Sequence, residues 1–187
     1  MCGISGYYSN HSFFSEGDLR NMTGVLSHRG PDSDGFFLEK ACGLGFKRLS
    51  IIDVSKNGDQ PMTSANKRFV IIYNGETYNY KELISLLDEE IRKELHSTTD
   101  TEIILELFSK YGTKFVRHLN GMFAIAIYDR ETENLFLFRD RNGIKPLFYY
   151  WDKKNFAFAS ELKSLMQLKQ IKHFKENENS HCNNKFK

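Results

Sequence analysis

The sequence predicts an α+β fold in which two antiparallel sheets stack face to face and helices cover their outer surfaces. Two observations support this prediction. The strand-like segments come in two separate runs, and the helix-like segments lie between the runs and towards the ends of the chain. Hydrophobic residues make up 40% of the 187 residues, with 16 Phe and 9 Tyr, so the chain can bury a large core without disulfides or metals.

The first run of strands lies in the N-terminal part of the chain. Apolar segments rich in aromatic and β-branched residues predict strands at 2–8, 36–38, 42–49 and 68–73. Apolar residues at helical spacing over 16–27 indicate a helix after the first strand. The last strand of this run is expected to end at Asn74-Gly75, because this pair favours an exposed, sharply bent turn.

Two amphipathic helices, over 80–91 and 101–111, separate the two runs. The second helix is predicted to start at a capping region, Thr98-Thr99-Asp100 with Glu102, and to end at Gly112. The second run of strands is predicted at 122–128, 135–138, 147–151 and 156–159, with a closing helix over 161–168. The composition turns polar from Lys169, so we expect one domain over 1–168 and a polar tail or linker remnant over 169–187.

Charge and cysteine content exclude several classes of function. With 26 Lys and Arg against 24 Asp and Glu, nothing favours nucleic acid or an anionic membrane as a partner. No signal peptide or membrane-spanning stretch is readable, so the cytoplasm is the expected compartment. Cys2, Cys42 and Cys182 lack the spacing of a metal site or a disulfide framework. Cys42 is expected to be a buried apolar residue, and Cys182 is assigned no role.

Cys2 is the residue with the most distinctive chemistry. Removal of Met1 would make Cys2 the first residue, with its α-amine next to its own thiol. The α-amine has a pKa of about 7.7–8.0, so part of it is unprotonated near neutral pH and can accept the thiol proton. Nucleophile and base would then come from a single residue. Position alone does not establish this role, because a small residue after the start methionine is common.

A succession of short motifs decides the interpretation. In chain order they are Met1-Cys2-Gly3-Ile4-Ser5-Gly6, His28-Arg29-Gly30-Pro31-Asp32, Arg48-Leu49-Ser50-Ile51-Ile52-Asp53, Gln60-Pro61-Met62, Tyr73-Asn74-Gly75-Glu76, Tyr78-Asn79-Tyr80, Thr99-Asp100-Thr101-Glu102, Leu119-Asn120-Gly121-Met122-Phe123-Ala124, Arg139-Asp140-Arg141-Asn142-Gly143-Ile144-Lys145-Pro146-Leu147 and Phe158-Ala159-Ser160-Glu161. This succession resembles the glutaminase domain of glutamine-dependent asparagine synthetases, which are class II glutamine amidotransferases. The resemblance covers about 2–165 and implies the N-terminal nucleophile hydrolase fold, a four-layer αββα sandwich.

The resemblance also implies a set of site residues. Cys2 would attack the side-chain amide of glutamine, and the Asn74 side chain with the Gly75 N–H would form the oxyanion hole. Arg48 would bind the substrate α-carboxylate, because a planar guanidinium suits bidentate binding. The other implied residues line the same pocket: Glu76 and Asp100 at the α-ammonium group, and Leu49, Ser50, Ile51 and Ile52 through their backbone. No cofactor and no metal is implied for this chain.

Other motif residues are expected to be structural. The segment 28–32 is expected to shape a loop near the nucleophile, and 139–141 to brace a strand end. Outside their motifs, Arg48 would be taken as a solvated charge, Asp100 as a helix cap and Asn74-Gly75 as a hairpin turn. Phe46, Lys47 and Thr77 depart from the usual residues of the family, but none of them is assigned a direct role.

Asparagine synthetases continue into a second domain that uses ATP, and this chain has no Ser-Gly-Gly-x-Asp-Ser loop for pyrophosphate. ATP and Mg²⁺ are therefore expected only for an absent synthetase domain or partner subunit that accepts the ammonia. The chain could be a stand-alone glutaminase subunit, an isolated domain or a truncated gene product. Two other functions stay open: the glutaminase of an amidotransferase that makes glucosamine phosphate or phosphoribosylamine, and a catalytically silent binding or regulatory module.

Overall fold

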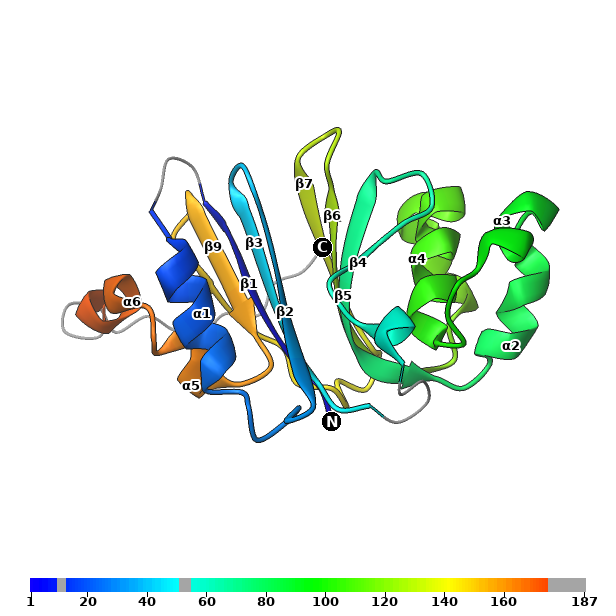
Figure 1. The fold of residues 1–187 in the computed structure, drawn as a ribbon. Coiled ribbons are helices and arrows are strands. Elements are labelled where there is room, and N and C mark those ends of the chain that lie inside the picture. The colour runs from blue at the N-terminus through cyan, green and yellow to red at the C-terminus, as the bar shows by residue number, and fades with distance from the viewer. Residues whose placement is uncertain (10–12, 51–54, 175–187) are drawn as a thin grey trace.

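The structure, a computed structural model, describes residues 1–9, 13–50 and 55–174. Two antiparallel sheets face each other, and helices cover the outer face of each (Figure 1). The first sheet has the strand order β2 (Ser33–Glu39), β3 (Cys42–Arg48), β1 (Gly3–Ser9), β9 (Asn155–Ala159) and β8 (Phe148–Trp151). The second has the order β4 (Met62–Thr63), β5 (Phe69–Thr77), β6 (Gly121–Asp129) and β7 (Asn134–Arg139). The predicted four-layer αββα sandwich is confirmed.

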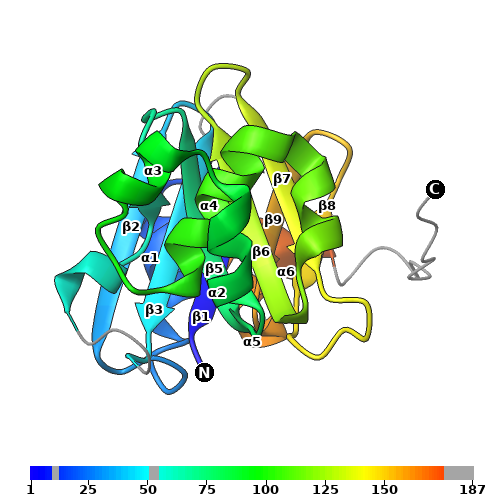
Figure 2. The same cartoon turned by 90° about the vertical axis from the view of Figure 1, so that its right-hand side faces the viewer.

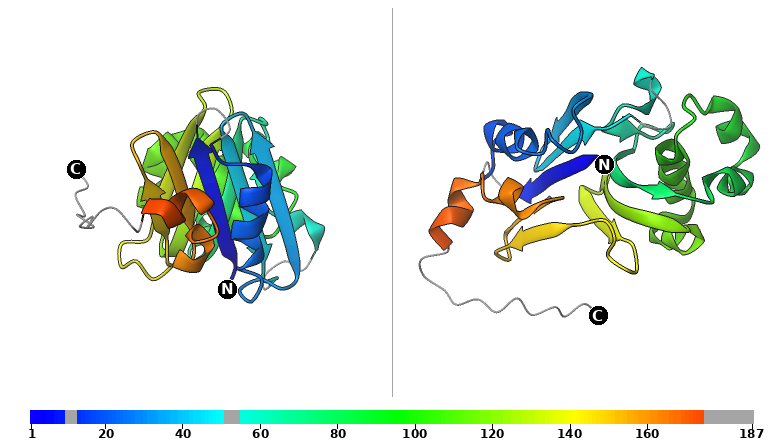
Figure 3. Two further views of the ribbon diagram at one scale, coloured as in Figure 1. Left: turned by 90° about the vertical axis from the view of Figure 1, so that its left-hand side faces the viewer. Right: turned by 90° about the horizontal axis from the view of Figure 1, so that it is seen from below.

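The helices divide between the two outer faces. Those on the first sheet are α1 (Glu16–Gly24), α5 (Leu162–Leu165) and α6 (Lys169–Phe174), as the left-hand view of Figure 3 shows. Those on the second sheet are α2 (Tyr80–Leu83), α3 (Glu89–Glu94) and α4 (Asp100–Tyr111), which face the viewer in Figure 2. Short 3₁₀ turns are η1 (Lys56–Gly58), η2 (Ile84–Leu86) and η3 (Gly112–His118). No helix within the described ranges is long and apolar enough to cross a membrane.

Three apolar layers hold the four structural layers together, and strand alternation assigns the side chains to them. In β5, Ile71 and Tyr73 pack against the helices of the second sheet, whereas Val70 and Ile72 pack between the two sheets. Because successive side chains of a strand point to opposite faces, Asn74 belongs to the face between the sheets. The polar end of β5 therefore lies between the two sheets, close to the start of β1.

The predicted turn at Asn74-Gly75 is wrong. Strand β5 continues through both residues to Thr77, and Asn74 and Gly75 pair with Ala124 and Phe123 of β6. The nine-residue ladder with β6 overrides the local turn preference of the dipeptide. The pair is therefore buried sheet backbone and not an exposed bend.

Two helix predictions also need correction. The segment 80–91 is not one helix but α2, η2 and α3, with an extended backbone at Leu87. Lys110 Nζ donates to Leu86 O at 3.0 Å, so this carbonyl has a partner without a continuous helix. The expected capping region before α4 does not form, because the N-cap Thr99 makes no side-chain cap hydrogen bond. Glu102 instead accepts from the backbone of His96 and Ser97.

The described structure continues beyond the expected end of the domain at Leu168. Helix α6 occupies the first six residues of the segment predicted as a polar tail. Gln170 Nε2 donates to Phe13 O at 2.9 Å, and Ile171 packs on the core layer outside the first sheet. Residues 169–171 therefore belong to the fold. Cys182, in the remainder of that segment, lies outside the described residues.

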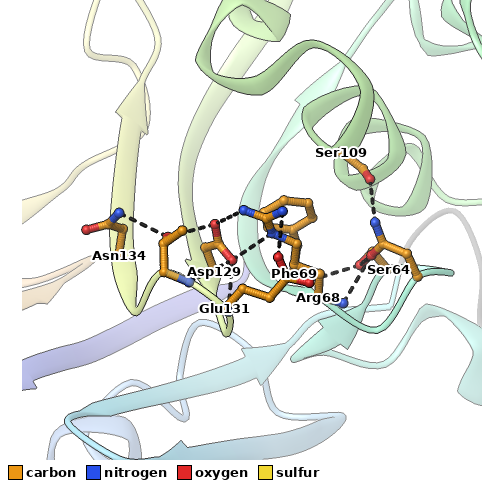
Figure 4. A network of polar contacts seen from close by, with 9 residues as sticks. Ser64, Arg68, Phe69, Ser109, Asp129, Glu131 and Asn134 are labelled. Carbon is orange, nitrogen blue, oxygen red and sulfur yellow. Dashed lines mark hydrogen bonds and ion pairs between the residues drawn. The ribbon is translucent and has the colours of Figure 1, made fainter.

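A polar network joins the start of β5 to the end of β6 (Figure 4). Arg68 donates through Nε and Nη2 to the two carboxylate oxygens of Asp129, at 2.9 and 2.7 Å. These hydrogen bonds hold the pKa of Asp129 well below its ordinary value. Ser64 accepts from the backbone N–H of Phe69 at 3.0 Å and so extends the network to β4. This end of the second sheet is pinned by side chains as well as by the ladder.

Candidate active site

A cavity of about 210 Å³ opens where strand ends of both sheets meet. The N-terminus lies between the sheets at this edge, as the view from below in Figure 3 shows. The cavity is lined by eight of the ten predicted site residues: Cys2, Arg48, Leu49, Ser50, Asn74, Gly75, Glu76 and Asp100. The other two, Ile51 and Ile52, lie outside the described residues. The fold thus brings together residues that are up to 98 positions apart in the sequence, from Cys2 to Asp100.

The Cys2 thiol is half-buried at the start of β1. Leu49 N lies 3.4 Å from Cys2 Sγ and donates to it, and Cys2 Sγ lies 3.7 Å from Leu49 O. Burial raises the pKa of the Cys2 thiol, while the Leu49 N–H and the charges of the N-terminal amine, Arg48 and Lys145 lower it. The thiol is therefore protonated at rest and needs a base to become a nucleophile.

Asn74 provides a hydrogen-bond donor without a partner. The side chain is 1% exposed, and its Nδ2 makes no hydrogen bond to any described residue. A buried donor left unpaired costs free energy, so such a group commonly serves a ligand or a reaction intermediate. Asn74 lines the same cavity as Cys2.

Gly75 is packed too tightly for any side chain. A Cβ at this position would lie 2.6 Å from Met122 O and 2.6 Å from Tyr73 Cε2. The glycine therefore lets β5 run close to β6 while its backbone borders the cavity.

Arg48 is held in place at the cavity wall. Its side chain is 8% exposed, and its Nη1 donates to Asp59 Oδ1 at 2.6 Å and to Ser55 O at 2.7 Å. Gly58 leaves room for the guanidinium, because a Cβ there would lie 2.4 Å from Arg48 Nη2. A planar cation fixed in this way is suited to binding a carboxylate.

Asp100 is a buried acceptor at the N-terminus of α4. Its Oδ2 accepts from Tyr73 Oη at 2.7 Å and from Thr77 N at 2.9 Å. Burial raises the pKa of the Asp100 carboxyl, although these two hydrogen bonds act in the opposite direction. Glu76, from the end of β5, is exposed and lines the same cavity. The cavity lining therefore holds two carboxylates in addition to the guanidinium of Arg48.

The segment 28–32 does shape the surroundings of Cys2, as predicted. Arg29 Nε donates to Cys2 O at 3.0 Å, and Arg29 Nη1 pairs with Glu161 Oε1 at 3.0 Å. Asp32 accepts from Ser50 N at 2.7 Å, which fixes the backbone beside the cavity. Burial alone would raise the pKa of Glu161, but hydrogen bonds from Arg29, His28 and Lys163 lower it to about 2.

The segment 139–145 has the structural role expected for its first residues. Asp140 is 6% exposed, and its carboxylate accepts from the backbone of Phe123, Ile144 and Lys145 at 3.2, 2.9 and 3.0 Å. Arg139 Nε donates to Lys145 O at 2.8 Å. The loop therefore holds the backbone of Lys145 from both sides and presents its side chain at the cavity.

Three residues of the site were given no role from sequence. Asp59 pairs with Arg48, Gln60 Oε1 accepts from Tyr73 N at 2.6 Å, and Lys145 lines the cavity beside Cys2. Gln60 and Lys145 stand within motifs quoted above, so their motif membership was an available signal. Nothing in the sequence singled out Asp59. Cys42, by contrast, is 1% exposed and packs between the sheets, as predicted.

Across the ranges that the structure describes, no group of His, Cys, Asp or Glu side chains is arranged to hold a metal ion. The chemical capacity of the cavity comes from a thiol, an amide donor, a guanidinium, an ammonium and two carboxylates. This set fits a nucleophilic attack on a small zwitterionic substrate.

Two solved structures share this architecture. Glutamine phosphoribosylpyrophosphate amidotransferase from B. subtilis superposes with a TM-score of 0.70 at 20% identity, over 89% of this chain and 43% of that one. A structure described as the allosteric regulatory enzyme of purine biosynthesis gives a TM-score of 0.70 at 17% identity. The two-sheet sandwich, with Cys2 directly before the inner strand β1, therefore belongs to a fold class that includes a solved amidotransferase.

Sequence comparison narrows this class to a family. The glutamine amidotransferase domain model matches residues 1–182, and the chain belongs to that family. A putative glutamine-hydrolysing asparagine synthetase of Methanocaldococcus jannaschii is 39% identical, over 91% of this chain and 36% of the relative. Asparagine synthetase 1 of Bacillus subtilis is 41% identical, over 89% of this chain and 27% of the relative. The chain thus shares its glutamine amidotransferase domain with these asparagine synthetases, and it spans 36% and 27% of their lengths.

Proposed function

We propose that this domain hydrolyses L-glutamine to glutamate and ammonia through a thioester on Cys2. The observation that carries the proposal is the buried, unpaired Nδ2 of Asn74, a residue that lines the same cavity as Cys2. A donor preorganised next to a nucleophile is what a tetrahedral oxyanion requires. The family membership of the chain supports glutamine as the source of that oxyanion.

The reaction requires removal of Met1, so that the α-amine belongs to Cys2. The amine takes the thiol proton while Sγ bonds to the side-chain amide carbon of glutamine, whose oxygen becomes an oxyanion. Asn74 Nδ2 and the Gly75 N–H would donate to this oxyanion. The intermediate then collapses: the C–N bond breaks, the amine returns its proton to the nitrogen, and ammonia leaves. Water adds to the thioester, and glutamate and the free thiol are released.

The charges around the cavity support free glutamine as the substrate, in preference to a glutamine residue within a peptide. Arg48 is placed to bind the α-carboxylate, and Asp100 and Glu76 to accept from the α-ammonium group. An incoming ammonium would favour the charged form of Asp100, whose pKa is raised by burial. Backbone groups of Leu49 and Ser50 complete the lining, and we propose the same role for Ile51 and Ile52. A glutamine residue within a peptide has no charged α-carboxylate and no charged α-ammonium group, so it could not make these two contacts.

We further propose that the ammonia passes to a synthetase domain or subunit that uses ATP and Mg²⁺. The similar glutamine-hydrolysing asparagine synthetases, of which this chain spans 36% and 27%, support such a partner. We propose a cytoplasmic location, because a catalytic thiol needs reducing surroundings. The present chain carries the glutaminase chemistry only, and asparagine formation would depend on the partner.

The decisive measurement is release of glutamate and ammonia from glutamine by the purified chain, after mass spectrometry confirms loss of Met1. We expect equal amounts of the two products and no turnover by Cys2→Ala. Cys42→Ala is the matched control, because that thiol lies between the sheets and lines no part of the cavity. Turnover by a folded Cys2→Ala variant, or no turnover by the folded, processed wild type, would overturn the proposal for this chain.

A further inference from the structure

Lys145 is a buried lysine with almost no partners. Lys145 is 5% exposed, and it lines the cavity together with Cys2. Its Nζ donates to Met1 Sδ at 3.2 Å, and no carboxylate of the described residues pairs with it. A buried ammonium is costly unless it is paired, so this placement calls for an explanation.

The position of Lys145 is built into the fold. Its backbone N–H donates to Asp140, and its carbonyl accepts from Arg139. Gly143, with a φ of +62°, adopts the left-handed backbone that the loop needs in order to turn. The two hydrogen bonds involve main-chain atoms of residue 145. They therefore set the location of the side chain without depending on its chemistry.

The sulfur that Lys145 contacts belongs to the residue bonded to Cys2. Loss of Met1 would remove this sulfur and leave the ammonium facing the new terminus. We propose that Lys145 is a positioning residue for the nucleophile: its ammonium holds the α-amine of processed Cys2 in the unprotonated form and favours the thiolate. This inference rests on the proposed function, since it assumes that the amine acts as the base.

Other charged groups surround the site. They are Arg48 on β3, Glu76 on β5, Asp100 at the start of α4, Asp140 in the lysine's own loop, and the Arg29–Glu161 pair behind the Cys2 carbonyl. Arg48 already pairs with Asp59, and Arg29 with Glu161, so each of these cations is partly neutralised. The Asp140 carboxylate is engaged by backbone N–H groups. Lys145, by contrast, forms no ion pair with a carboxylate of the described residues.

The electrostatic consequence has a definite sign. A neighbouring cation disfavours a protonated amine and favours a thiolate, so it lowers the pKa of both groups. The charge of Lys145 acts on the Cys2 thiol in this direction, against the effect of burial. Both effects enlarge the fraction of enzyme that is ready to react near neutral pH.

The test is the pH dependence of Cys2 alkylation by iodoacetamide in the full chain after Met1 removal. Peptide mass spectrometry separates Cys2 from the other two cysteines. We expect Lys145→Met to move the alkylation profile upwards by about one pH unit, which lowers the rate at neutral pH up to about tenfold. Lys145→Arg should restore the wild-type profile. Lys114→Met, which removes an exposed lysine outside the cavity, should leave it unchanged.

Kinetics provide a second readout. The acidic limb of kcat/KM for glutamine should shift in the same direction in Lys145→Met, with KM nearly unchanged. Lys145→Gln serves if the methionine variant does not fold. A superimposable alkylation profile, or an equal shift in Lys145→Arg, would overturn the inference. Because alkylation needs no turnover, a shifted profile in a chain without glutaminase activity would refute the proposed function and leave the electrostatic role of Lys145 intact.

Discussion

Asn74 shows how a single residue can reveal a site through a contact that is missing. Its Nδ2 is buried without a partner, although most buried polar groups in folded proteins are paired. We expect Asn74→Ala to lower kcat by about 10²–10³ with little change in KM, because the donor acts on the intermediate and not on the bound substrate. Steady-state glutaminase kinetics would measure this. Asn134→Ala, on β7, is the control, and a loss in KM alone would refute the role.

Arg48 depends on a neighbour that the sequence did not single out. Asp59 holds Nη1 at 2.6 Å and thereby orients the guanidinium. We expect Arg48→Lys to raise the KM for glutamine more than tenfold, because an ammonium cannot form the bidentate contact. Asp59→Asn should raise KM by less and leave kcat nearly unchanged. Comparable glutamine binding by wild type and Arg48→Lys in calorimetry would show that the carboxylate lies elsewhere.

Strand β5 is the element on which the site depends most. It places Asn74, Gly75 and Glu76 at the cavity through a continuous ladder with β6. A methyl group at Gly75 would collide with Met122 O, which is backbone and cannot swing aside. We therefore expect Gly75→Ala to lower the free energy of unfolding by about 1–3 kcal/mol and to reduce activity.

Gly24→Ala is the matched control for this substitution. Gly24 ends α1, and a Cβ there meets nothing within 4 Å. Alanine is the better helix former, so this variant should be as stable as the wild type or more stable by up to about 1 kcal/mol. Urea denaturation of both variants would test the pair. Equal stabilities for Gly75→Ala and Gly24→Ala would contradict the packing argument.

At the scale of the whole molecule, Glu161 links the two ends of the described chain. Its carboxylate binds His28, Arg29 and Lys163, which lies within α5, and the Arg29 guanidinium also reaches Cys2 O. The pKa of Glu161 falls from an ordinary value of 4.5 to about 2 in the fold. The folded state thus binds the proton less tightly than the unfolded chain. The stabilisation is complete above pH 4.5 and is lost as the pH falls towards 2.

Denaturant unfolding of the wild type and Glu161→Gln across this pH range would test the linkage. The wild type should be the more stable protein at neutral pH, and the difference should shrink steadily below pH 4.5. Glu131→Gln, at a side chain that is 65% exposed, should show a much smaller change. A difference in stability that does not vary with pH would mean that Glu161 acts through packing and not through its charge.

The sequence alone predicted two stacked antiparallel sheets with helices outside them, and it named residues that lie around one cavity. The periodicity of 68–73 and 122–128 marked the central strands β5 and β6, and the motifs named eight residues that the fold places around one cavity. Local signals sufficed here because strand alternation and helical spacing are written in neighbouring residues. Gly112 correctly marked the end of α4 for the same reason.

Tertiary contacts decided what local signals could not. Asn74-Gly75 is strand and not turn because β6 supplies a ladder partner from about 50 residues further along the chain. Thr99 and Glu102 form no cap because the Glu102 carboxylate is occupied by the backbone of His96 and Ser97. The pairing of Arg48 with Asp59 and the placement of Lys145 beside Cys2 exist only where strand ends of both sheets converge. Contacts of this kind depend on distance in space, which the order of residues does not record.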